Sequence, residues 1–241
     1  MLNKYLLHPY SRSSKHFMYD GIVFDNFGTL LDVYSETTAR ANALNLPSDF
    51  VSIWRENQLS YTWLRTCMGR YSNFWKVTLD ALNWTLAYYK LTITPRQKKQ
   101  LMYSWLKLKP FDEIKDSLEK IQKVTQNIYI FSDGTPQMLE KGLKFAGIRS
   151  YFKKVLSVDA VKTYKPNPRD YSYLERQLCI PKEKLLFVSG TSWETQGAKS
   201  YGFSTVWINR NGLPSDNLGF PADYTYASLT DAINTKDQST G

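Results

Sequence analysis

Short apolar runs alternate with helical stretches along most of the chain. Runs typical of strands buried on both faces occur at 21–24, 128–131, 155–157, 185–188 and 204–208. Apolar residues at helical spacing, together with capping signals, predict helices at 112–124, 135–147, 168–178 and 191–198. A repeated order of strand, loop and helix is typical of parallel sheets with helices on both faces. We therefore predict an α/β fold with a doubly wound, Rossmann-like parallel sheet.

One long segment without strand patterns interrupts this alternation after the first strand. Helices are predicted within it at 50–68, 71–90 and 96–106, and Thr94 followed by Pro95 marks the start of the third. The first of these helices carries a row of apolar residues at helical spacing, namely Phe50, Trp54, Tyr61, Leu64 and Met68. We therefore expect an all-helical cap domain, 34–107, inserted into an α/β core domain made of 20–33 and 108–235.

The two ends of the chain are predicted to lie outside both domains. Residues 1–19 contain Lys4, Arg12 and Lys15 but no acid, a composition that suits a disordered extension or an organelle transit segment. Met18 is a candidate alternative start. Ser228 is predicted to cap a short last helix, and 236–241 to form a loose tail.

Composition narrows the classes of partner. The net charge of +9 suits nucleic-acid binding, but basic residues are mixed with acids and the densest group, 96–99, lies on a solvated helix face. We therefore expect a small anionic substrate and no nucleic acid. No apolar run approaches the roughly 18 residues that span a bilayer, which predicts a soluble protein without a membrane partner. Cys67 and Cys179 lie too far apart to suggest a disulfide framework, so we expect a reducing, cytoplasmic location.

Polar residues follow several predicted strands. Asp25 comes directly after the first strand, and Asn26, Gly28 and Thr29 after it are typical of a tight turn. Because ligands of open α/β sheets bind beyond the carboxyl ends of the strands, Asp25 is placed where chemistry is usually done. Taken alone, Asp25 could equally cap the loop or the next helix. The only histidines, His8 and His16, precede the first strand, which argues against a catalytic histidine.

The order of polar groups resembles that of the haloacid dehalogenase superfamily, in which an Asp nucleophile, a Ser or Thr, a Lys and an acidic loop follow one another. Here these are Asp25, Ser132, Lys165 and the loop that ends at Glu194. The motifs at 24–30, 132–137, 164–166 and 187–189 fall in register with that pattern, and the resemblance covers about 20–235.

One departure selects a branch of this superfamily. Its magnesium phosphatases carry a second Asp two positions after the nucleophile, where this chain has Phe27, and the last loop offers the single carboxylate of Glu194. Several oxygen ligands are needed for a divalent cation, so we predict no metal site and no cofactor. An aromatic residue at this position is a feature of the (S)-2-haloacid dehalogenase branch, which the chain resembles here. The motifs at 54–65 and 70–74 also resemble the cap of that branch. Membership of that branch implies a homodimer.

The resemblance implies a role for each catalytic group. Asp25 attacks C2 of an (S)-2-haloacid with inversion and forms an ester, Arg55 receives the halide, Lys165 keeps Asp25 ionised, and Glu194 activates water. The residues expected to bind or enclose the substrate, or to position Glu194 and the water, are Asn26, Phe27, Thr29, Leu59, Phe74, Ser132, Asp133, Tyr171, Ser189, Thr191 and Trp193. The branch has Asp in place of Glu194 and Asn in place of Thr191, which leaves the rate of ester hydrolysis open.

Several of these residues also have a purely structural interpretation, without a role in catalysis or binding. Lys165 could be a surface lysine before a proline turn, and Arg55 a solvated helix residue. Phe74 and Trp193 could be ordinary core residues. Two other functions compete with dehalogenation, namely a magnesium-dependent phosphomonoesterase of the same superfamily and a catalytically inert basic binding protein.

Overall fold

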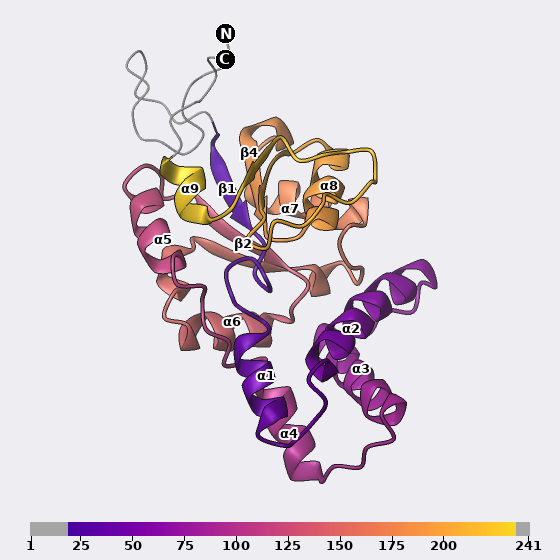
Figure 1. Cartoon of the computed structure of the whole chain (residues 1–241). Coiled ribbons are helices and arrows are strands. Elements are labelled where there is room, and N and C mark those ends of the chain that lie inside the picture. The colour runs from indigo at the N-terminus through magenta and orange to yellow at the C-terminus, as the bar shows by residue number, and fades with distance from the viewer. Residues whose placement is uncertain (1–18, 235–241) are drawn as a thin grey trace, which may run out of the picture.

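A six-stranded parallel sheet forms the centre of the protein, whose computed structural model describes residues 19–234 (Figure 1). The strands are β1 Gly21–Phe24, β2 Ile128–Ser132, β3 Lys154–Ser157, β4 Leu185–Ser189, β5 Ser204–Ile208 and β6 Tyr224–Tyr226. Their order across the sheet is β3-β2-β1-β4-β5-β6, and each adjacent pair is parallel. The structure confirms the predicted α/β fold with a doubly wound parallel sheet.

Strand β1 lies in the middle of the sheet, and its Ile22, Val23 and Phe24 are fully buried. A strand covered on both faces needs apolar residues at every position, which explains why the run showed no alternation. Phe24 is paired with Ile130 of β2 on one side and with Val188 of β4 on the other. The chain leaves β1 first toward one edge of the sheet and later toward the other, so a crevice opens beyond its carboxyl end.

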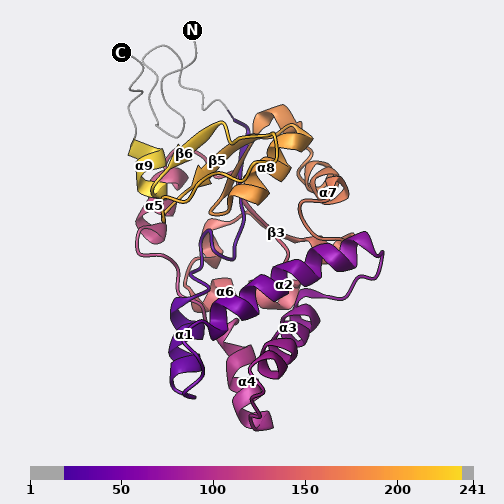
Figure 2. The same cartoon turned by 45° about the vertical axis from the view of Figure 1, so that its right-hand side comes forward.

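Helices cover both faces of the sheet. The core helices are α5 Ile114–Gln122, α6 Pro136–Phe145, α7 Pro168–Leu178, α8 Ser192–Tyr201 and α9 Leu229–Asn234, with short 3-10 turns at Arg149–Tyr151, Val158–Ala160 and Lys182–Lys184. Helices α5 and α9 pack together on one face, and α7 and α8 on the other (Figures 1 and 2). The Ser228 hydroxyl accepts the N–H of Asp231, so the predicted cap of the last helix is correct.

Four helices between β1 and α5 form a separate layer beyond the carboxyl ends of the strands. They are α1 Ser35–Asn42, α2 Phe50–Cys67, α3 Phe74–Tyr88 and α4 Pro95–Ser104. Helices α2 and α3 pack along each other, and α2 lies nearer the sheet (Figure 2). The predicted start of α4 is correct, since Thr94 and Gln97 form a reciprocal capping box. None of the helices in 19–234 is both long and apolar enough to cross a membrane.

One expectation about the fold is wrong. We expected the sheet to end at β5, but Tyr224–Tyr226 adds an edge strand that pairs only with β5. Three partly exposed residues after a long loop carry too short a pattern to reveal a strand. The apolar row of α2 is buried only at its start, because Leu64 and Met68 are 52% and 62% exposed. The predictions for residues 1–18 and 235–241, including the start at Met18, lie outside the described residues.

Candidate active site

A tight turn directly after β1 presents Asp25. The Asn26 carbonyl accepts three backbone N–H groups within this turn, and Gly28 adopts a φ of 87°, which glycine tolerates without strain. The Thr29 hydroxyl donates to Asp25 Oδ2 at 2.8 Å and accepts the N–H of Gly190 at 2.8 Å. Thr29 therefore fixes the carboxylate and also joins the turn after β1 to the loop after β4.

Lys165 brings a buried positive charge against Asp25. Its Nζ lies 3.0 Å from Asp25 Oδ1, donates to the Phe131 carbonyl at 2.9 Å, and forms an ion pair with Glu194. The side chain is 1% exposed, so the surface-lysine interpretation is wrong. Burial alone lowers the pKa of Lys165, but the carboxylates of Asp25, Glu194 and Asp133 outweigh it and raise the pKa above its ordinary value. The ammonium therefore stays charged and lies against the Asp25 carboxylate.

Glu194, in the first turn of α8, is held by hydroxyl donors. Its Oε2 accepts hydrogen bonds from Ser189 Oγ at 2.8 Å and Thr191 Oγ1 at 3.3 Å. The Tyr171 hydroxyl reaches its backbone carbonyl, at 3.4 Å, and not its carboxylate. Burial, reinforced by the charge of Asp25, raises the pKa of Glu194 above its ordinary value. A carboxylate with a raised pKa is a better proton acceptor than one in water.

Arg55 enters the site from α2 and is 7% exposed, so the solvated-residue interpretation is wrong. Its Nη1 donates to Gln58 Oε1 at 2.5 Å, and Gln58 Nε2 donates to Thr78 Oγ1 on α3 at 2.5 Å. Within residues 19–234 no carboxylate lies within ion-pair distance of this guanidinium. Burial lowers the pKa of Arg55, but an arginine stays charged in proteins. Arg55 is thus a buried cation with room for an anion.

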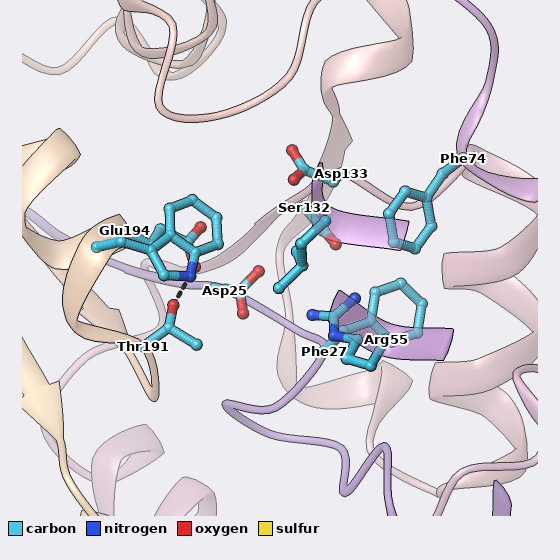
Figure 3. A pocket seen from close by; sticks show the side chains of 10 residues that line it. Asp25, Phe27, Arg55, Phe74, Ser132, Asp133, Thr191 and Glu194 are labelled. Carbon is cyan, nitrogen blue, oxygen red and sulfur yellow. Dashed lines mark hydrogen bonds between the residues drawn. The ribbon is translucent and has the colours of Figure 1, made fainter. Parts of the chain in front are cut away.

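These groups surround a small cavity of about 10 Å³ (Figure 3). It is lined by Asp25, Phe27, Arg55, Leu59, Phe74, Ser132, Asp133, Thr191, Trp193 and Glu194. In Figure 3, Asp25 lies between Thr191 and Glu194 on one side and Arg55 and Phe27 on the other. The rings of Phe27 and Phe74 stack with centroids 5.7 Å apart. Such apolar walls exclude water, which strengthens electrostatic interactions inside.

A wider hollow of about 420 Å³ adjoins this cavity and shares Phe27, Arg55, Leu59 and Thr191 with it. Arg210 also lines the hollow, but its guanidinium is paired with Glu113 at 2.7 Å. Arg55 is therefore the cation that offers an unneutralised charge to an anion arriving through the hollow.

The predicted site residues fall into two groups. Ten of the fifteen line the cavity, as given above. The other five stand outside this lining and are Asn26, Thr29, Lys165, Tyr171 and Ser189. The Asn26 side chain is fully buried, and its amide has no hydrogen-bond partner among the residues that the structure describes. Neither the Asn26 nor the Phe27 N–H donates to a backbone carbonyl within 19–234.

Sequence reasoning missed Gln58, which orients Arg55. A signal was available, because residues three apart on a helix are neighbours and an amide oxygen is a natural partner for a guanidinium. It also missed Trp105 after α4, whose ring lies 5.6 Å from the Arg55 guanidinium carbon. Nothing in the sequence pairs Trp105 with Arg55, since 50 residues separate them.

The residues at this edge do not fit a magnesium ion. All four carboxylate oxygens of Asp25 and Glu194 are engaged by Lys165, Thr29, Ser189 and Thr191. Phe27 stands where a second acid would be needed, and no group of three or more His, Cys, Asp or Glu side chains within 19–234 is arranged to hold a metal. A hard cation requires several free oxygen ligands, so the steps below use only protein groups.

Comparisons with known proteins agree with this geometry. A family model described as haloacid dehalogenase-like hydrolase matches residues 19–202. The chain belongs to the haloacid dehalogenase-like hydrolase family. An (S)-2-haloacid dehalogenase of this family from Pseudomonas sp. (strain YL) is 37% identical over 222 residues, which cover 92% of this chain and 96% of the relative. Haloacetate dehalogenase H-2 from Moraxella sp. (strain B) is 35% identical over 89% of this chain and 96% of its own length.

Solved structures place the chain among the dehalogenases of this hydrolase family. The L-2-haloacid dehalogenase from Xanthobacter autotrophicus with chloropropionic acid covalently bound superposes with a TM-score of 0.81 at 30% identity, over 89% of this chain and 96% of that one. Another L-2-haloacid dehalogenase gives a TM-score of 0.85 at 37% identity, over 88% of this chain and 96% of that one. The predicted membership of the (S)-2-haloacid dehalogenase branch is confirmed.

Proposed function

We propose that this protein hydrolyses short (S)-2-haloalkanoic acids to (R)-2-hydroxy acids through a covalent ester on Asp25. The observation that carries the proposal is one buried ammonium, Lys165, in contact with both Asp25 and Glu194, across a ring-walled cavity from Arg55. This arrangement provides a nucleophile, a base and an anion receiver without a metal. The similarity to named (S)-2-haloacid dehalogenases supports the same reaction.

In the first step a carboxylate oxygen of Asp25 attacks C2 of the substrate. The new bond is C2–O, the bond that breaks is C2–halogen, and the electron pair leaves with the halide toward Arg55. Attack from the side opposite the halogen inverts C2. The Ser132 hydroxyl, which lines the cavity, and the N–H groups of Asn26 and Phe27 are suited to the substrate carboxylate. A guanidinium is a dependable halide partner because it cannot lose its proton.

In the second step water attacks the carbonyl carbon of the Asp25 ester. Glu194, which is held in position by hydrogen bonds from Ser189 and Thr191, accepts a proton from that water. The bond between the ester oxygen and the acyl carbon breaks, the leaving alkoxide takes up a proton, and the hydroxy acid departs. One oxygen of the restored Asp25 carboxylate then comes from water.

A halide-release assay tests this function. We expect chloride or bromide to be released from the (S) enantiomers of 2-chloropropionate and 2-bromopropionate, with (R)-lactate as product, and Asp25→Ala to abolish release. A matched panel contains a phosphate monoester with added magnesium. Phosphate release there with no halide from either haloacid overturns the proposal in favour of a phosphomonoesterase, and no turnover of any substrate overturns it in favour of an inert binding protein.

We further propose that two copies associate through the cap and that the protein acts in the cytoplasm on a small anion, without nucleic acid. Large apolar side chains remain exposed on the cap helices, and they are Trp63, Leu64, Trp84, Tyr88 and Tyr103. Both cysteines are unpaired, which suits a reducing compartment. Sedimentation at several concentrations is expected to give twice the mass of one chain, and a monomer at high concentration contradicts the association.

A further inference from the structure

Asp133 places a third acid in the cavity beside Asp25 and Glu194. It follows β2 directly, lines the cavity, and is 7% exposed. Its Oδ1 accepts the backbone N–H of Lys165 at 3.2 Å, while Oδ2 has no hydrogen-bond partner within 19–234. The reaction steps proposed above give this carboxyl no task, so its presence needs a separate account.

The charges around the cavity do not balance for an anionic substrate. With every acid ionised, Asp25, Asp133 and Glu194 carry three negative charges, and Lys165 and Arg55 carry two positive ones. A 2-haloacid carries a carboxylate and brings a further negative charge into a site that is shielded from water. Unpaired charges of one sign are costly in such surroundings. A proton on one of the three acids lowers the excess of negative charge in the occupied site from two to one.

The contacts identify which acid this is. Asp25 accepts from Thr29 and faces the ammonium of Lys165, and Glu194 pairs with the same ammonium while accepting from Ser189. Each of these contacts stabilises a negative charge. Asp133 receives only one backbone N–H, so it has the fewest donors of the three acids. Burial also raises the pKa of Glu194, to about 8, but Glu194 keeps the ion pair with the Lys165 ammonium that Asp133 lacks. A neutral carboxylic acid also has an O–H, and that donor is what an incoming carboxylate lacks on this wall.

We infer that Asp133 binds the substrate as a neutral carboxylic acid, donating a hydrogen bond to the anion, so that 2-haloacids bind tightly only while Asp133 holds its proton. At a pH where the free Asp133 is ionised, binding of the anion draws one proton from solvent onto the Asp133 carboxylate. This inference rests on the proposed function, because it concerns how the same site accepts its substrate.

The surroundings of Asp133 agree with this behaviour. Burial raises the pKa of Asp133 to about 7, with the charges of Asp170 and Asp25 adding to the rise and Lys165 opposing it. The titratable or charged groups that face Asp133 are Asp25 from β1, Arg55 from α2, Tyr164 and Lys165 from the loop before α7, Asp170 and Tyr171 from α7, and Glu194 from α8. The two tyrosines have raised pKa values, so they stay neutral in this range.

The test compares Asp133→Asn with the unmodified protein over pH 6 to 9. For the unmodified protein we expect the KM for (S)-2-chloropropionate to rise by about tenfold per pH unit once Asp133 is ionised, because one proton is linked to binding. For Asp133→Asn, whose amide is a permanent donor, the KM is expected to stay within about twofold across the range. A matched control is Asp170→Asn, a second buried acid that bonds to Thr163 and does not line the cavity. It is expected to keep a KM that rises with pH, with the rise displaced toward lower pH because the charge of Asp170 no longer raises the pKa of Asp133.

Calorimetry with propionate, a carboxylate without halogen, gives a readout that needs neither turnover nor a variant. At pH 8 to 9 in two buffers of different ionisation enthalpy, binding to the unmodified protein is expected to take up close to one proton. Halide release together with equal KM profiles for the two proteins, or with no proton uptake on propionate binding, overturns the role of Asp133 and leaves the proposed function standing. Absence of halide release from every 2-haloacid overturns the proposed function itself.

Discussion

The cavity has a core wall, formed by the loops after the strands and carrying Asp25 and Glu194, and a cap wall, formed by α2 and carrying Arg55. The two walls hold their charged groups in opposite ways. On the core wall, Asp25 and Glu194 are bound by an ammonium and by hydroxyls that come from the ends of several strands. On the cap wall, Arg55 has one neutral hydrogen-bond partner, Gln58, and its guanidinium lies 5.6 Å from the ring centroid of Trp105. The donors of the core wall bond to the acids of the same wall, whereas the cation of the cap wall remains available to bind an anion.

This difference separates two tasks. Groups that form and break the ester need fixed positions and fixed protonation, and the carboxyl ends of a packed parallel sheet provide rigid anchor points. A leaving halide needs a positive charge that is not already neutralised. Changes on the core wall are therefore expected to affect every substrate alike, while changes on the cap wall are expected to depend on the leaving group.

The largest effect is expected for Glu194→Gln on the core wall. An amide accepts no proton from water, so the ester on Asp25 should form but hydrolyse slowly, with turnover reduced by about 10³-fold for chloride and bromide substrates alike. Mass spectrometry after substrate addition is expected to show an adduct on Asp25. Glu140→Gln, at an exposed ion pair of the core, serves as control. A fully active, unmodified Glu194→Gln variant removes this residue from the mechanism.

A smaller and selective effect is expected for Arg55→Lys on the cap wall. Lysine keeps the positive charge but lacks the planar guanidinium, which donates to Gln58 and can also donate to the leaving anion. Turnover should therefore fall by about 10²-fold with 2-chloropropionate. The loss should be smaller with 2-bromopropionate, because bromide is the better leaving group. Steady-state halide release measures both. Arg65→Lys, on the same helix but paired with Asp80, should change neither rate much. Equal losses for the two halogens contradict a halide role.

A still smaller effect is expected for Gln58→Leu, which removes the amide that positions Arg55. Turnover of 2-chloropropionate should fall by about tenfold, with the ratio of bromide to chloride rates shifted in the same direction as for Arg55→Lys. Thr62→Val is a matched control one turn along α2, since the Thr62 hydroxyl donates to the Leu59 carbonyl and to no other group within 19–234. If both variants reduce activity without altering that ratio, Gln58 has only a structural role.

The smallest effect concerns stability and pH. The folded pKa of Asp133 is about 7, against an ordinary 3.8, so the folded state binds the proton more tightly than the unfolded chain. The stability that this proton provides is complete below pH 4 and is lost as pH rises through 7. Asp133→Asn does not titrate, so its melting temperature relative to the unmodified protein should rise between pH 4 and 8, by about 8–16 °C for the roughly 4 kcal/mol that a rise of about three pKa units represents. A constant difference across that range contradicts a raised pKa.

Much of the fold and of the site followed from local pattern. A run such as 21–24 can only be buried on both faces, and an acid, a turn and a hydroxyl directly after it can only lie at the carboxyl edge of the sheet. Helix starts at Thr94 and Thr135 were predictable because capping is decided by neighbouring residues. The strand Tyr224–Tyr226 was not predictable, because it forms only by pairing with β5.

The sequence by itself determined the order of elements and which polar residues stand at strand ends, because both depend on contacts within a few positions. Only the tertiary structure decided that Lys165 lies between Asp25 and Glu194, that Arg55 is buried next to Gln58, and that Asp133 joins them in one cavity. Burial and charge pairing arise between residues brought together by packing from distant parts of the chain. Protonation and reactivity depend on those two quantities, so the chemistry of the site becomes visible only in three dimensions.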